Sequence, residues 1–186
     1  MKKIYLLIFA AVLFSLSAKA QDFDDIDETP HDIVYYRTSK ISPPLIKVTY
    51  GRPAKHNQVV FGNKVPYNKI WRTGDNEATE IKFYKDILFG DVKIVAGTYS
   101  LFTIPNKNEW QIILNAQTDI HGACFYNPKL NLAKITVPVK NAEELEYFSI
   151  GFKNKKNGVD MVLAWDTVRV SVPISIKHQS KLLVKR

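Results

Sequence analysis

The chain has 186 residues, of which 46% are hydrophobic, and carries a formal net charge of +8 with one cysteine, Cys124. A single cysteine excludes an internal disulfide, so the folded part must be stabilised by its core alone. The histidines lack the closely spaced pairs of a structural zinc site, and the glycines are too sparse for a phosphate-binding loop. We therefore expect no metal and no cofactor. No nucleic-acid-binding motif accompanies the positive charge, so nucleic acid is not an expected partner.

The N-terminus has the features of a processing segment. Lys2 and Lys3 precede an apolar run over residues 4–16, and Ala18-Lys19-Ala20 offers small residues at a cleavage site. This pattern predicts a signal peptide over residues 1–20 and an exported protein, periplasmic or secreted. The apolar run is shorter than the ~20 residues that span a bilayer. After cleavage we expect no transmembrane segment.

Charge and composition divide the mature chain. Residues 21–32 hold six acids and no Lys or Arg, whereas residues 33–186 carry a net +11 from 23 basic and 12 acidic residues. We expect an acidic, flexible leader over residues 21–40, because it has too little apolar surface to offset ordering entropy. One folded domain is expected over residues 41–177, and a basic C-terminal tail over 178–186.

Apolar and polar residues alternate with a period of two through the predicted domain, the pattern of half-buried strands. A helical turn is expected only at residues 141–145, with Asn141 as a cap. Short strands separated by regular turns predict an all-β fold: a single-domain antiparallel β-sandwich of about nine or ten strands. The sequence leaves the oligomeric state open. The expected strands cover residues 46–50, 79–83, 87–89, 92–94, 99–104, 110–114, 132–137, 145–153, 159–165 and 168–176.

The densest chemical signal lies at residues 65–79, where aromatic, basic, acidic and amide side chains surround one glycine turn. Arg72 is suited to a planar, paired contact with an anionic group, and Asp75 or Glu77 to the role of a base. Loops on a rigid β scaffold are where binding sites usually lie. The candidate ligand-binding residues are Arg52, Tyr67, Trp71, Arg72, Asp75, Asn76 and Glu77.

A structural interpretation of the same residues stands beside this one. Arg72 then pairs with Asp75 or Glu77, Asn76 caps a turn, and Trp71 belongs to the core, because ion-pair networks also cluster charges without function.

Two further candidates lie outside the cluster. His56 and His121 both fall in expected loops, so a meeting of the two in space would make either one a general base. Cys124 follows His121 closely, but its small and aromatic neighbours favour a buried, inert thiol in a strand.

These residue types favour a binding or envelope-associated module for an anionic or carbohydrate ligand. The alternative is an extracytoplasmic hydrolase of glycans or envelope polymers, with Asp75 and Glu77 as acid and base and Arg72 as an electrostatic clamp. The binding module is the leading hypothesis, because arginine, aromatic and acidic side chains gather on one loop.

The motifs of residues 50–110 are similar to those of the exported bacterial family named domain of unknown function 2911, and Trp165 with Pro173-Ile174 resembles its closing strands. The resemblance implies a secreted or periplasmic protein of Bacteroidota-type bacteria and supplies no activity and no catalytic residues. The chain departs from the family pattern at Asn57-Gln58 and at His121-Gly122. The similar blocks are Tyr50-Gly51-Arg52-Pro53, Phe61-Gly62, Val65-Pro66-Tyr67, Trp71-Arg72-Thr73-Gly74-Asp75-Asn76-Glu77-Ala78-Thr79, the run from Ala96 to Pro105, and Glu109-Trp110.

Overall fold

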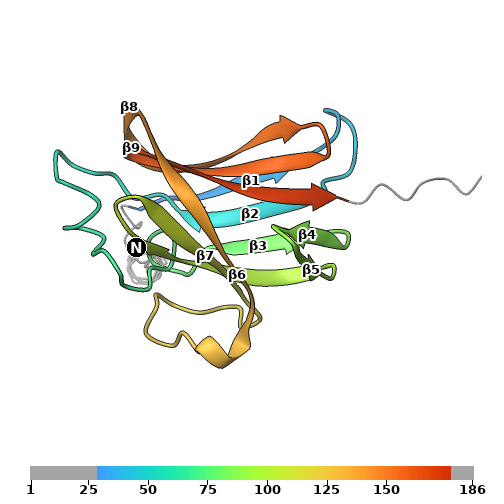
Figure 1. Ribbon diagram of the computed structural model, residues 1–186, viewed down its shortest axis with the longest axis horizontal. Coiled ribbons are helices and arrows are strands. Elements are labelled where there is room, and N and C mark those ends of the chain that lie inside the picture. Colours follow the sequence, from blue (N-terminus) through green and yellow to red (C-terminus); the bar gives the residue numbers. More distant parts are fainter. Residues whose placement is uncertain (1–28, 177–186) are drawn as a thin grey trace, which may run out of the picture.

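The computed structural model describes residues 29–176, which form an all-β arrangement with one short 3-10 helix and no α-helix (Figure 1). The all-β prediction is confirmed. The predicted signal peptide, the acids of residues 21–28 and the tail of 178–186 lie outside the described residues. The elements are β1 (His31–Tyr36), β2 (Ile46–Gly51), β3 (Glu80–Phe83), β4 (Ile87–Phe89), β5 (Val92–Ile94), β6 (Gly97–Pro105), β7 (Glu109–Asn115), η2 (Pro128–Leu130), β8 (Asn131–Lys155) and β9 (Gly158–Ile176).

The strands pair antiparallel in the order β1-β2-β3-β6-β7-β8-β9-β4-β5. The long strand β8 joins the two layers, because its first part pairs with β7 and its later part pairs with β9. The inner faces of the layers meet in one core, where the Tyr50 ring of β2 packs edge-on against Phe148 of β8 at 5.5 Å. The two layers of the predicted sandwich are thus two parts of one continuous sheet (Figure 1).

Two pairs of expected strands are continuous elements in the structure. Residues 132–137 and 145–153 both belong to β8, and the other pair belongs to β9. Strand β9 contains both 159–165 and 168–176 and turns at Asp166, whose φ is 50°. A Cβ on Gly158 would lie 2.2 Å from the Ile174 carbonyl oxygen, whereas a straight strand would separate these residues by about 50 Å. Strand β9 therefore folds back on itself, and Gly158 allows the close backbone approach.

The expected helical turn at residues 141–145 is wrong. These residues belong to β8, where the pairing with β9 shifts register between Asn141 and Leu145. A single helical turn is costly to nucleate, whereas the neighbouring strand offers partners for the backbone N–H and C=O groups.

The folded sheet begins earlier than the sequence indicated. Residues 31–36, assigned above to the flexible leader, form the edge strand β1 and pair with β2 from His31–Gly51 to Tyr36–Ile46. Val34 and Tyr36 pack against the main core. This assignment to the leader is wrong because two apolar contacts and a backbone ladder outweigh the low overall hydrophobicity of the segment.

The centre of the core is an aromatic cluster. Trp71 lies within it, with ring centroids 5.1 Å from Phe148, 6.0 Å from Trp110 and 6.0 Å from Trp165. Phe61 completes the cluster at 4.8 Å from Trp110. Each buried aromatic ring removes ~150–250 Å² from water, which explains how this domain reaches stability without a disulfide.

A second, smaller core lies on the other face of β6 and β7. Phe102 and Ile113 project to that side and pack with Ile120 and Tyr126 of the following loop. Figure 1 shows this loop and η2 on the side of β6 and β7 away from β9. The loop buries the second face of β6, so residues 99–103 are buried on both faces of the strand. Asp119 and Ile120 of the same loop also line a surface pocket.

Candidate functional site

The segment Trp71–Thr79 is held by bonds to itself and to β6. Trp71 exchanges backbone hydrogen bonds with Thr103 at 2.8 and 2.9 Å, and its indole N–H donates to the Gly74 carbonyl at 3.0 Å. The Thr79 hydroxyl donates to the Thr73 carbonyl at 2.6 Å. These bonds tie the turn to itself and to β6.

The backbone of this segment is unusual. Thr73 and Asn76 have φ values of 62° and 55°. Asn tolerates the left-handed region, but a β-branched residue there is strained. The buried Thr73 hydroxyl donates to the Thr103 hydroxyl at 3.2 Å, so the surrounding bonds hold Thr73 in its strained conformation.

The turn also presses directly against the end of β2. A Cβ on Gly51 would lie 2.0 Å from the Asp75 carbonyl oxygen, and one on Gly74 would lie 2.9 Å from the Gly51 carbonyl oxygen. No side chain fits at either position without moving backbone. Gly51 and Gly74 therefore serve the packing of the turn against β2.

Each of the two candidate arginines has an aspartate partner. Arg72 pairs with Asp75 through its guanidinium, and Asp75 also accepts a hydrogen bond from the Thr29 hydroxyl at 3.3 Å. Arg52 pairs with Asp32 at 3.2 Å and lies over the Tyr147 ring at 4.9 Å. Because each positive charge is compensated by its own carboxylate, we do not assign an anionic ligand to the arginines.

The aromatic candidates contribute to packing. Trp71 is 8% exposed and lies in the aromatic core. Tyr67 is half-buried against that core and covers Gly62, where a Cβ would lie 2.7 Å from the Tyr67 ring. Asn76 accepts a backbone hydrogen bond from Gly122 at 2.9 Å. The structural interpretation of Trp71 and of the Arg72–Asp75 pair thus agrees with the structure.

Glu77 is placed differently from the other candidates, because it borders an open pocket of about 360 Å³. Two backbone contacts join residues 77–78 to residues 120–121 beside the pocket. The Ala78 N–H donates to the Ile120 carbonyl at 2.8 Å, and Glu77 forms an isolated bridge with His121. Three carboxylates and no Lys or Arg line the pocket. Its lining residues are His31, Thr49, Glu77, Ala78, Glu80, Asp119 and Ile120.

Local contacts fix the acidic side chains. The Glu77 carboxylate lies 3.2 Å from His121 Nδ1, and the Asp119 N–H donates to Glu80 Oε1 at 2.9 Å. Asp119 has a φ of 57°, which turns the chain at the pocket rim. In strand β3, Glu80 pairs with Thr49 on one side and Ser100 on the other. The carboxylates therefore come from two chain segments, residues 77–80 and the loop that holds Asp119.

The structure separates several residues that the sequence analysis joined. Asp75 binds Arg72 and Thr29, whereas Glu77 borders the pocket, so the two acids do not act on a common space. The proposed meeting of His56 and His121 does not occur. The His56 N–H donates to Glu146 at 2.8 Å, while His121 lies beside Glu77.

Sequence reasoning missed the other three ionisable side chains of the pocket: His31, Glu80 and Asp119. Alternation in residues 79–83 does place Glu80 on the outer face of its strand, opposite Ile81. His31 was assigned to the leader, and Asp119 stood in a loop without a partner in sequence. Only the pairing of distant segments brings the three together.

The expected burial of Cys124 is wrong, because its side chain is exposed within the turn that follows His121. Phe102 and Tyr126, at 4.9 Å between centroids, already fill the space beneath this loop. Cys124 is exposed because the loop places Tyr126, and not Cys124, against Phe102.

A third charged cluster is structural. Lys55, 8% exposed, donates to Glu144 at 2.7 Å and to Asp166 at 3.0 Å. Hydrogen bonding to Glu144, followed by that to Asp166, raises the pKa of Lys55. Burial raises the pKa of Tyr50, whose hydroxyl accepts the Ile150 N–H at 3.1 Å. Both groups tie the irregular part of β8 to its neighbours.

Among residues 29–176, no group of three or more His, Cys, Asp or Glu is placed to hold a metal ion. Within the same residues, no helix is long and apolar enough to cross a membrane.

Fold and pocket together define an all-β protein with an antiparallel sheet that carries a carboxylate-lined depression on its outer face. The chain belongs to the family described as Protein of unknown function (DUF2911), whose profile matches residues 30–174, and this confirms the resemblance noted from the motifs. Searches of curated proteins and of solved structures found no match.

Proposed function

We propose that this protein is an exported binding module that holds an uncharged carbohydrate in the pocket of Glu77, Glu80 and Asp119. The observation that carries the proposal is a pocket of about 360 Å³ with three carboxylates and no basic side chain other than His31. This volume lies in the range of ~300–1,000 Å³ of small-molecule sites.

The charge of the pocket selects between the two ligand classes considered above. Ionised carboxylates only accept hydrogen bonds, and the hydroxyl groups of a sugar are donors. An anionic ligand would meet Glu77, Glu80 and Asp119 with like charge, which costs several kcal/mol at an interface. Thr49 and the apolar Ala78 and Ile120 provide the less polar part of the lining. A neutral polyhydroxyl ligand fits this combination best.

The test is calorimetric titration of the purified chain with neutral oligosaccharides, namely maltotriose, cellotriose, xylotriose and chitotriose, and with anionic trigalacturonate. We expect at least one neutral trisaccharide to bind and trigalacturonate not to bind. Replacing a hydrogen-bonded carboxylate with its amide in Glu77→Gln or Asp119→Asn should weaken binding about tenfold, since such a bond is worth ~1.5–3 kcal/mol.

Glu109→Gln is the matched control, because Glu109 is an exposed acid of β7 that does not line the pocket. It should leave the affinity unchanged. Equal binding by the wild-type chain and by Glu77→Gln, or binding of trigalacturonate alone, contradicts the proposal.

A hydrolase is the second candidate, and one observation favours it: the pocket holds more than one carboxylate, as glycoside hydrolysis requires. Glu77, which lies 3.2 Å from His121 Nδ1, would be one member of the pair. Glu80 or Asp119 replaces Asp75 as the other, because Asp75 is bound to Arg72. Release of reducing sugar from the bound oligosaccharide, lost in Glu77→Gln with binding retained, would identify an enzyme.

A further inference from the structure

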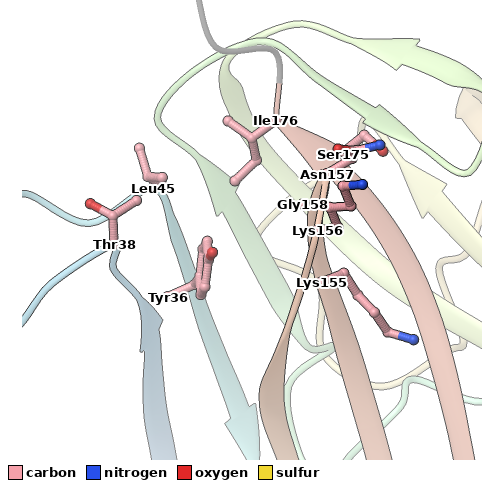
Figure 2. Close-up of a pocket in the computed structure, with 9 residues that line it drawn as sticks. All are labelled: Tyr36, Thr38, Leu45, Lys155, Lys156, Asn157, Gly158, Ser175 and Ile176. Carbon is pink, nitrogen blue, oxygen red and sulfur yellow. The ribbon is translucent and has the colours of Figure 1, made fainter.

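A second pocket, of about 370 Å³, opens at another part of the sandwich, between the end of β1 and the β8–β9 hairpin. Figure 2 shows Tyr36, Thr38 and Leu45 on one side, the hairpin residues on the other, and Ile176 between them. No residue of this pocket lines the carboxylate-lined pocket of Glu77.

The floor of this second pocket is apolar. Tyr36, Leu45 and Ile176 pack against the main core yet remain partly accessible. Tyr36 is held in place by Phe152 of β8, with the two rings 5.6 Å apart. An apolar floor of this kind is favourable for burying hydrocarbon.

The rim of the pocket is basic. Lys155 and Lys156 line it, and no Asp or Glu does. Lys155 is paired with Asp160 at 3.0 Å, and Figure 2 shows its ammonium directed away from Tyr36. Lys156 has no ion-pair or hydrogen-bond partner among residues 29–176. The rim thus carries one uncompensated positive charge, with the hydroxyl groups of Thr38 and Ser175 beside it.

We propose that this pocket binds a single-chain amphiphilic carboxylate, such as a fatty acid of medium length. Its hydrocarbon chain lies against Tyr36, Leu45 and Ile176, and its carboxylate faces Lys156. The charge and the apolar floor both favour this class, because an anion meets the free ammonium while the chain leaves water. The proposal is independent of the carbohydrate site, since the two pockets share no residue and have linings of opposite charge.

The test uses sodium decanoate below its critical micelle concentration, with 1-decanol as the uncharged probe of equal chain length. Backbone amide NMR signals of the full chain should shift at Gly158 and Ser175, and decanoate should bind more tightly than decanol. Lys156→Ala should weaken decanoate binding about three- to fivefold, as expected for one partly exposed charge pair, and leave decanol binding unchanged.

Two further variants locate the site. Thr38→Trp places a large ring at the mouth of the pocket from an exposed turn, and should abolish decanoate binding while the remaining amide signals keep their positions. Lys129→Ala removes a lysine from η2, on the loop that covers the other face of the sheet, and should change nothing.

Three results overturn the proposal. The first is no decanoate binding. The second is equal affinity for decanoate and decanol with no effect of Lys156→Ala. The third is a set of shifts centred on exposed apolar residues elsewhere, such as Phe125, which is 68% exposed. Loss of oligosaccharide binding in the same samples would bear only on the carbohydrate site.

Discussion

Two adjacent regions use the same kinds of side chain in opposite ways. In the turn from Trp71 to Asp75, the polar groups bond to one another and to β6, and the indole lies in the core. In the pocket that begins at Glu77, the carboxylates border open space. A cluster of reactive residue types in the sequence is therefore not sufficient to identify a binding site. What distinguishes the regions is whether the side chains face one another and the core or border open space.

The largest expected effect lies in the turn. Trp71→Ala removes a side chain that contacts four other aromatic rings, and should lower the free energy of unfolding by about 3–5 kcal/mol. Urea denaturation measures the change. Phe125→Ala, at an aromatic that is 68% exposed, should stay within about 0.5 kcal/mol. A small loss in Trp71→Ala would mean that the ring is not part of the core.

The close contact between β2 and the turn gives the next effect. In Gly51→Ala the new methyl group would lie 2.0 Å from the Asp75 carbonyl oxygen, so we expect a destabilisation of about 2–3 kcal/mol through forced backbone movement. Gly151→Ala is the matched control, because a Cβ there meets nothing within 4 Å. Similar thermal midpoints for the two variants would show that the turn does not press on β2.

A smaller effect is expected at the ion pair of the turn. Arg72→Met keeps most of the side-chain length but removes the partner of Asp75. Partly exposed ion pairs contribute at most about 1 kcal/mol, so the loss should not exceed that value. The difference from the wild-type chain should shrink in 1 M salt, because screening weakens the pair. A salt-independent difference would indicate that packing of the side chain matters more than its charge.

The smallest stability effect is expected at the pocket. Glu77 is exposed and contacts His121 at the surface, so Glu77→Gln should alter the free energy of unfolding by less than about 0.5 kcal/mol. The same variant is expected to weaken carbohydrate binding about tenfold. A destabilisation above 1 kcal/mol in the same denaturation assay would show that Glu77 has a structural role, like the residues of the turn.

Much of the fold followed from periodicity. Alternation of apolar residues at 46–50 and at 79–83 gave strands whose inward side chains, Ile46, Val48 and Ile81, are fully buried. The expected strands at residues 87–89 and 92–94 are β4 and β5, joined by a tight turn in which Gly90 has a φ of 59°. Each of these features depends on residues close together in the chain, and for that reason local patterns predict them.

The errors share the opposite property. Strand β1 is stable because β2 lies beside it, and residues 141–145 are extended because β9 pairs with them irregularly. Cys124 is exposed because Tyr126 fills the space over Phe102. In the candidate site, Glu77 was identified from its neighbourhood, while His31 and Asp119 reached the same pocket from distant segments. No local pattern carries that information.

The sequence by itself determined the strand-forming periodicity, the aromatic content of the core and the membership of the family. Period-two alternation and turn residues act within a few positions of one another, so they can be recognised in the sequence. The tertiary structure alone decided which polar residues face inward to hold the Trp71–Asp75 turn and which line a pocket. The reason is physical: a side chain's role depends on the partners that pairing of remote strands brings within hydrogen-bonding distance.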